Sequence, residues 1–208
     1  MLNKFTTDWN GLFKTHPSLY TTDSVTIIEK GTTAKNKQLT VNCTEVVSFP
    51  SKQFDGYDMF NSLTNRNCDG VLLVSNELGT YDLVFIEMKS RFSTQEVFDA
   101  KCQIVETYTK LQSLFQMMKA YHSLPIRRIY GVIETQKLDD DQEVWWSKQQ
   151  MLPESDMQFG ERLLKYPFID APTRCAKELN MPDKMAFRIL LSDDVNYTVD
   201  YSDLCNSL

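Results

Sequence analysis

The chain has 208 residues, of which 42% are hydrophobic and 24% charged, and its formal net charge at pH 7 is −6. This composition is typical of a globular protein with one sizeable core, and the negative charge argues mildly against a protein that coats nucleic acid. The sequence has no run of about 18 apolar residues, and its N-terminal stretch has no continuous apolar region after Lys4, so we expect neither a membrane span nor a secretory signal. We expect a single domain over residues 1–208 that does not associate with membranes.

The arrangement of the cysteines and the absence of several catalytic motifs limit the compartment and the kinds of catalysis that the sequence supports. Five cysteines are scattered along the chain without a CxxC pair, which indicates free thiols in a reducing compartment, and we therefore expect a cytoplasmic protein. The only histidines are His16 and His122, and no GxxxxGK, GxGxxG or GxSxG motif is present. Carboxylates, lysines and hydroxyls must therefore carry any catalysis.

In chain order, the first predicted elements are a short helix at 5–15 and two hairpins, with mainly loop at 50–66 between them. Each hairpin is predicted from two runs rich in β-forming residues that a short polar or glycine-containing turn separates. The four runs lie at 24–30, 39–49, 68–76 and 81–90. The hairpins should supply an antiparallel part of a sheet.

A long helix is predicted at about 94–122, directly after the second hairpin. Ser93 and Glu96 fit the S-x-x-E capping box, which satisfies amides that a helix start leaves unpaired. The apolar residues of this segment recur at alternating spacings of four and three, and Lys101 interrupts the stripe that they form. A strand follows at 126–135. The remaining predicted elements are helices near 160–166 and 172–180 and a strand at 186–192.

The second hairpin ends with a pair of opposite charges. After four apolar residues at 83–86, the predicted strand presents Glu87 and Lys89, which must point to the same face because strand side chains alternate. Opposite residues of a hairpin have position numbers with a roughly constant sum, which places Asp69 opposite positions 87–89. Two converging carboxylates suit a hard divalent cation such as Mg²⁺, and a lysine beside it can stabilise developing charge or help to deprotonate a water.

This combination of a hairpin, an acid–lysine strand end and a long helix resembles the PD-(D/E)XK nuclease superfamily. That superfamily includes type II restriction enzymes, archaeal Holliday junction resolvases and RecB-like exonuclease domains. The residues that carry the resemblance are Asp69, Glu87, Lys89, Lys101 and Gln103. The resemblance covers about residues 40–135 and implies an α/β fold, with a central mixed β-sheet flanked by helices and a restriction-endonuclease-like αβββαβ core. Residues 136–208 would then elaborate this core.

The resemblance also implies an activity, namely hydrolysis of phosphodiester bonds in nucleic acid with Mg²⁺ or Mn²⁺ as the cofactor. In such enzymes the first acid and the glutamate bind the metal and the lysine serves the nucleophile. These roles fall on Asp69, Glu87 and Lys89. Further catalytic candidates are Lys101 and Gln103. Members often carry another acid near the front of the core, for which Glu45 is the candidate.

The sequence departs from the family pattern at two points. Cys68 stands where a proline often precedes the first acid, a change that a loosely defined motif tolerates. Tyr108 follows Gln103 by five residues, whereas the RecB-like Q-x-x-x-Y pattern has four, and this puts membership of that subgroup in doubt.

The resemblance implies a nucleic-acid partner, with DNA expected rather than RNA, and the middle of the chain is locally basic, although solvated surface charge explains any single residue there as well. Between Glu87 and Arg128 there are seven basic and four acidic residues. Candidate phosphate contacts are Arg91, Lys119, Arg127 and Arg128. A catalytically inactive module of this fold, binding nucleic acid or a protein partner, remains an alternative. So does an unrelated α/β interaction protein in which Glu87 and Lys89 form only a surface pair. A homodimer or a larger complex is compatible with each of these readings.

Overall fold

A computed structural model describes residues 2–12, 18–29, 38–49, 54, 66–76, 79–118, 124–137, 154–172 and 184–205. The helices are α1 (Leu2–Leu12), α2 (Thr94–Phe115), α4 (Glu154–Lys165) and α5 (Tyr201–Cys205). The strands are β1 (Thr21–Ile28), β2 (Gln38–Phe49), β3 (Gly70–Ser75), β4 (Tyr81–Lys89), β5 (Ile126–Thr135), β6 (Ile169–Pro172), β7 (Lys184–Leu191) and β8 (Asn196–Asp200).

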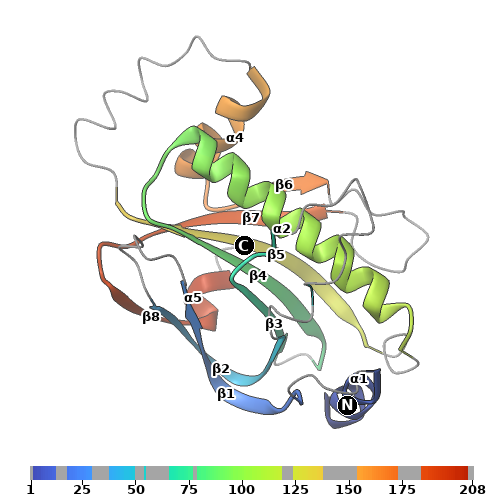
Figure 1. The fold of residues 1–208 in the computed structure, drawn as a ribbon. Coiled ribbons are helices and arrows are strands. Elements are labelled where there is room, and N and C mark those ends of the chain that lie inside the picture. The colour runs from blue at the N-terminus through green and yellow to red at the C-terminus, as the bar shows by residue number, and fades with distance from the viewer. Residues whose placement is uncertain are drawn as a thin grey trace.

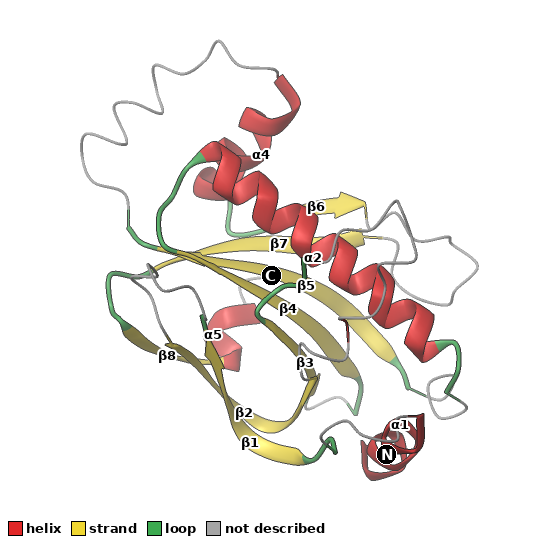
Figure 2. Ribbon diagram, viewed as in Figure 1, coloured by secondary structure: helices red, strands yellow, loops and turns green. Residues whose placement is uncertain are grey.

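The protein has an α/β fold in which helices flank one mixed sheet of eight strands (Figures 1 and 2). The strand order is β1-β2-β3-β4-β5-β7-β6, and β8 pairs with β2 outside this path. Strands β1 to β4 are antiparallel neighbours, whereas β4, β5 and β7 run parallel. The fold class predicted from the sequence, α/β with a mixed sheet between helices, is confirmed at this level.

Strands β3 and β4 lie at the centre of the sheet and are buried on both faces. One apolar cluster joins Leu83 and Phe85 to residues of α1, α2 and α4, and a second joins Val84 and Ile86 to residues of β1, β2, β8 and α5. Strand β1 comes so close to the start of β3 that a Cβ on Gly70 would lie 2.5 Å from the Ile27 side chain. Because both faces are covered, these strands read as continuous apolar runs rather than as alternating patterns.

Most predicted elements are present, with shifted ends. Both hairpins form, and the strand predicted at 126–135 has those bounds. The Ser93 hydroxyl caps α2 by accepting from the Glu96 amide at 3.2 Å, as predicted. Helix α2 ends at Phe115, earlier than expected, and the helix predicted at 172–180 lies, beyond its first residue, outside the described part of the chain. Strands β6 and β8 and helix α5 were not predicted, because each is only four or five residues long.

Helix α2 makes the connection between the parallel strands β4 and β5. It lies across the face of the sheet to which Leu83 and Phe85 contribute (Figure 1). This arrangement holds the helix directly over the end of β4, where the candidate site residues lie. Among the described helices, none is long and apolar enough to cross a membrane.

Candidate active site

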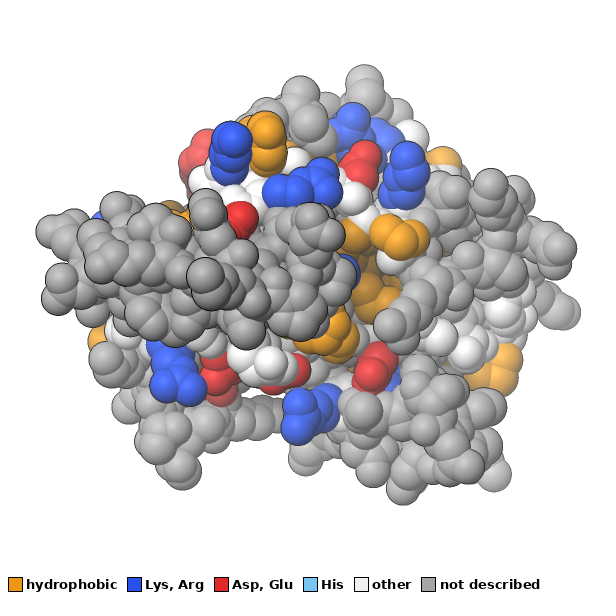
Figure 3. Space-filling model, turned by 90° about the horizontal axis from the view of Figure 1, so that it is seen from above, with side chains coloured by type: hydrophobic (Ala, Val, Ile, Leu, Met, Phe, Trp, Pro, Cys, Tyr) orange, Lys and Arg blue, Asp and Glu red, His pale blue; other side chains and the backbone are white. Residues whose placement is uncertain are grey.

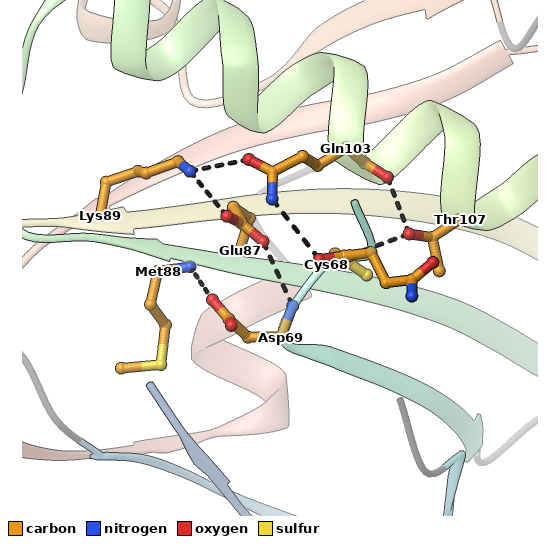
Figure 4. Close-up of polar contacts among 8 residues, drawn as sticks. Cys68, Asp69, Glu87, Met88, Lys89, Gln103 and Thr107 are labelled. Atoms are coloured by element: carbon orange, nitrogen blue, oxygen red, sulfur yellow. Dashed lines mark hydrogen bonds and ion pairs between the residues drawn. The ribbon is translucent and has the colours of Figure 1, made fainter. Parts of the chain in front are cut away.

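Asp69 and Glu87 meet at the open end of the second hairpin. Gly70 pairs with Ile86. Asp69, just before Gly70, therefore lies opposite Glu87, just after Ile86. The Asp69 amide donates a hydrogen bond to Oε2 of Glu87 at 3.2 Å, and the Met88 amide donates to Oδ2 of Asp69 at 2.8 Å (Figure 4). Asp69 and Glu87 therefore lie opposite one another, as the predicted hairpin register requires.

Lys89 lies on the same side of β4 as Glu87. Its Nζ donates to Oε1 of Glu87 at 2.7 Å and to Oε1 of Gln103 on α2 at 2.8 Å (Figure 4). The side chains of Lys89 and Glu87 are only 14% and 4% exposed. The two side chains therefore do not form an exposed surface pair, because α2 covers this end of the strand.

The Glu87 carboxyl has an unusual environment for an acid. Its pKa is raised to about 8, chiefly because burial penalises the charged form and also because the Asp69 carboxylate lies close by. The Lys89 ammonium opposes this shift by favouring the charged form. The Asp69 contribution is the part of this shift that additional positive charge beside the two acids would offset.

The donor set fits a magnesium or manganese ion better than a zinc ion. Mg²⁺ takes oxygen ligands and often uses only one or two carboxylates, with waters and substrate phosphates completing its shell. Asp69 and Glu87 supply that number of carboxylates. Within the described ranges, no group of three or more His, Cys, Asp or Glu side chains is positioned to hold a metal ion, as a structural zinc site would require.

Lys101 does not join this group, contrary to expectation. Its ammonium lies 4.5 Å from the centre of the Phe159 ring and 5.8 Å from that of Phe98. Helix α2 packs against α4, and the Lys101 ammonium therefore lies over the ring of Phe159 on α4. Gln103, two residues further along α2, provides the contact with Lys89 instead.

The additional acid was also assigned wrongly. Glu45 lies on β2 just before the pairing of Val46 with Val74, close to the end of β3, whereas Asp69 precedes the start of β3. It lines a separate cavity of about 720 Å³, which Arg127 and Tyr201 also line. Glu29, just after β1, was not among the predicted acids, and its charge makes a smaller contribution to the raised pKa of Glu87.

Two of the candidate phosphate-binding residues lie at the opposite end of the sheet from Glu87. Arg127 is bound by buried Asp82, with distances of 3.0 Å from Nε to Oδ1 and 2.6 Å from Nη2 to Oδ2. This guanidinium therefore forms an ion pair with Asp82 while its own side chain is 34% exposed, and its assignment to nucleic acid stays a prediction. Arg128 is the partner of Asp82 in the β4–β5 ladder and lines a cavity of about 320 Å³.

The remaining candidate phosphate contacts are Arg91, which is exposed, and Lys119, whose position the structure does not describe. Arg91, two residues beyond Lys89, is 72% exposed and lies 3.7 Å from Glu96. Lys119 lies outside the described residues. On the face seen from above, Lys and Arg side chains stand among Asp and Glu side chains, without a continuous basic stripe across the described part (Figure 3). A phosphate backbone would therefore meet charges of both signs here.

The structure thus brings together four of the predicted site residues, which are Asp69, Glu87, Lys89 and Gln103. No protein-family model matches the chain, and no curated protein and no solved structure matches it significantly. The geometry of these four residues therefore carries the functional proposal.

Proposed function

We propose that the protein is a Mg²⁺- or Mn²⁺-dependent nuclease of the PD-(D/E)XK type that hydrolyses phosphodiester bonds. The observation that carries this proposal is the meeting of three charged residues at the end of a buried strand. The Asp69 amide donates to the Glu87 carboxylate, and the Lys89 ammonium lies 2.7 Å from that carboxylate. The order of elements gives further support. Helix α1, the antiparallel strands, helix α2 and the parallel strand β5 follow the αβββαβ succession of that superfamily, with one additional strand at the front.

Each of the four residues has a separate task in this proposal. Asp69 and Glu87 would hold the cation, which when bound would supply a Lewis acid for a phosphoryl oxygen. The Lys89 ammonium lies beside these acids, where it can orient an attacking water and stabilise charge that develops on the phosphate. Gln103 accepts a hydrogen bond from Lys89, which keeps the ammonium directed at Glu87. Burial of the pair strengthens these electrostatic contacts because water is largely excluded.

The substrate class is tested first with DNA, the expected substrate, and then with RNA. Purified protein would be incubated with duplex DNA, single-stranded DNA and RNA, in Mg²⁺, in Mn²⁺ and in EDTA. We expect cation-dependent cleavage that falls on the order of 100-fold or more in each of Asp69→Asn, Glu87→Gln and Lys89→Met. The matched control is Glu45→Gln, which removes an acid from the separate cavity and should cleave as the wild type does. Cleavage that survives all three site substitutions would refute the site.

A catalytically inactive module that binds nucleic acid or a protein partner is the second candidate. It is favoured by the net charge of −6 and by the mixed signs of the surface in Figure 3. The engagement of Lys89 by both Glu87 and Gln103 is also what a purely structural network would show. Binding of nucleic acid in EDTA, without cleavage in any cation, would favour this candidate.

A further inference from the structure

Helix α2 holds the chain segment that leads to Asp69 through three side chains on one of its faces. These side chains belong to residues 103, 107 and 110, at spacings of four and three, which places them on neighbouring turns of one helical face. The segment that they contact is 66–68, directly before Asp69. The hairpin and the helix therefore both act on the position of this acid.

Thr107 makes the contact nearest to Asp69. Its Oγ1 accepts a hydrogen bond from the Cys68 amide at 2.9 Å and donates to the Gln103 carbonyl at 2.7 Å (Figure 4). Both Thr107 and Cys68 are buried, with exposed fractions of 0% and 1%. Loss of this hydroxyl would leave a buried amide without its acceptor, so the contact fixes the main chain one residue before the acid.

Lys110 makes the second contact, one turn further along the helix. Its Nζ donates to Oδ1 of Asn67 at 2.6 Å and to the Arg66 carbonyl at 3.2 Å, and the residue is fully buried. Burying an ammonium group is costly unless hydrogen bonds compensate. The hydrogen bonds to Asn67 and Arg66 supply part of this compensation, and they tie the helix to the segment before Asp69.

We infer that Thr107 and Lys110 are positioning residues that hold the main chain before Asp69, so that its carboxylate stays beside Glu87 in the geometry that a divalent cation requires. This inference rests on the proposed function for its catalytic meaning, because it assigns a role toward the same metal ligands. It goes beyond that proposal in naming two residues that contact neither cation nor substrate. Partners of metal ligands typically change metal affinity 10- to 100-fold when they are removed.

The test uses the full chain and two readouts besides cleavage. The first is amide hydrogen exchange at Cys68 and Asp69 in metal-free protein, and the second is the Kd for Mn²⁺ alone. Thr107→Val keeps the side-chain volume but removes the hydroxyl, and Thr107→Ser restores it. The matched control is Thr109→Val, because that threonine makes the same kind of contact, to the Val105 carbonyl at 2.9 Å, without bonding to the segment.

We expect Thr107→Val to speed exchange at the two amides at least tenfold and to weaken Mn²⁺ binding about tenfold or more, with Thr107→Ser close to wild type and Thr109→Val unchanged. If Thr107→Val does not fold, Asn67→Ala probes the Lys110 contact from the segment side and should produce the same two effects. Unchanged exchange and unchanged Mn²⁺ affinity in the folded variants would overturn the inference. Faster exchange with rescue by serine, in a protein that cleaves nothing, would support the positioning role while removing the proposed function.

Discussion

The Asp69 amide and the Glu87 carboxylate share a hydrogen bond of 3.2 Å that ties together the ends of two buried strands. The contact brings a second carboxylate, that of Asp69, close enough to raise the pKa of Glu87. A protein gains no stability from two acids placed in this way. Such arrangements are expected where function requires them, since functional sites often depart from what would stabilise the fold.

This pair should make the cation-free protein less stable as pH rises. The pKa of Glu87 is raised from 4.5 to about 8, so the folded state binds this proton more tightly than the unfolded state does. The resulting stability is present below the unfolded pKa and is lost as pH rises towards 8. In EDTA, the Tm should therefore fall less between pH 5 and pH 8 for Glu87→Gln than for wild type. Each kcal/mol of free energy of unfolding corresponds to roughly 2–4 °C in Tm for a chain of this size. Parallel pH profiles in thermal unfolding check this, and superimposable profiles would contradict it.

Gln103 should matter for turnover more than for binding. Its Oε1 accepts from Lys89 at 2.8 Å, and Gln103→Leu would leave the ammonium less well directed. We expect kcat to fall about tenfold with KM little changed, because the lost contact orients a catalytic group rather than the substrate. The control is Gln95→Leu, since that residue lies on the exposed part of α2 and bonds to Asp99. A change confined to KM would argue for a substrate-binding role instead.

Lys101 should matter for stability and not for cleavage. Its ammonium lies over the Phe159 ring, so Lys101→Met should leave cleavage within about twofold of wild type and lower the free energy of unfolding by about 0.5–1 kcal/mol. Urea unfolding and initial cleavage rates measure the two effects. A loss of cleavage comparable with that of Lys89→Met would mean that Lys101 reaches the site.

The ion pair at the other end of β4 should affect stability alone. Arg127→Met would leave the buried Asp82 carboxylate without its guanidinium partner, and Tyr201, at 2.5 Å, cannot supply the missing charge. The expected cost is about 3–5 kcal/mol in the free energy of unfolding, measured with denaturant. Arg128→Met, at the exposed neighbouring position, should change it by about 0.5 kcal/mol or less. Equal losses in the two variants would show that the pair with Asp82 contributes little.

Contacts between residues close in the sequence could be predicted, whereas contacts between distant segments could not. Asp69 and Glu87 were paired correctly because one short turn sets the register of a hairpin. Lys101 was misplaced because helical periodicity gives the face of a residue but does not show that α4 packs there. Glu29 was missed because the approach of β1 to the start of β3 depends on packing between segments that are distant in the sequence. The roles of Thr107 and Lys110 left no signal in the sequence, since their partners lie more than 30 residues away.

The central claim is that Asp69 and Glu87 together bind a divalent cation. The most direct measurement is the Tm of wild type, Asp69→Asn and Glu45→Gln at pH 7.5 over a titration of Mn²⁺. A ligand that binds only the folded state raises its stability with concentration. We predict a rising Tm for wild type and Glu45→Gln and a flat response for Asp69→Asn. A flat response in all three proteins, or an equal rise in all three, would contradict the claim.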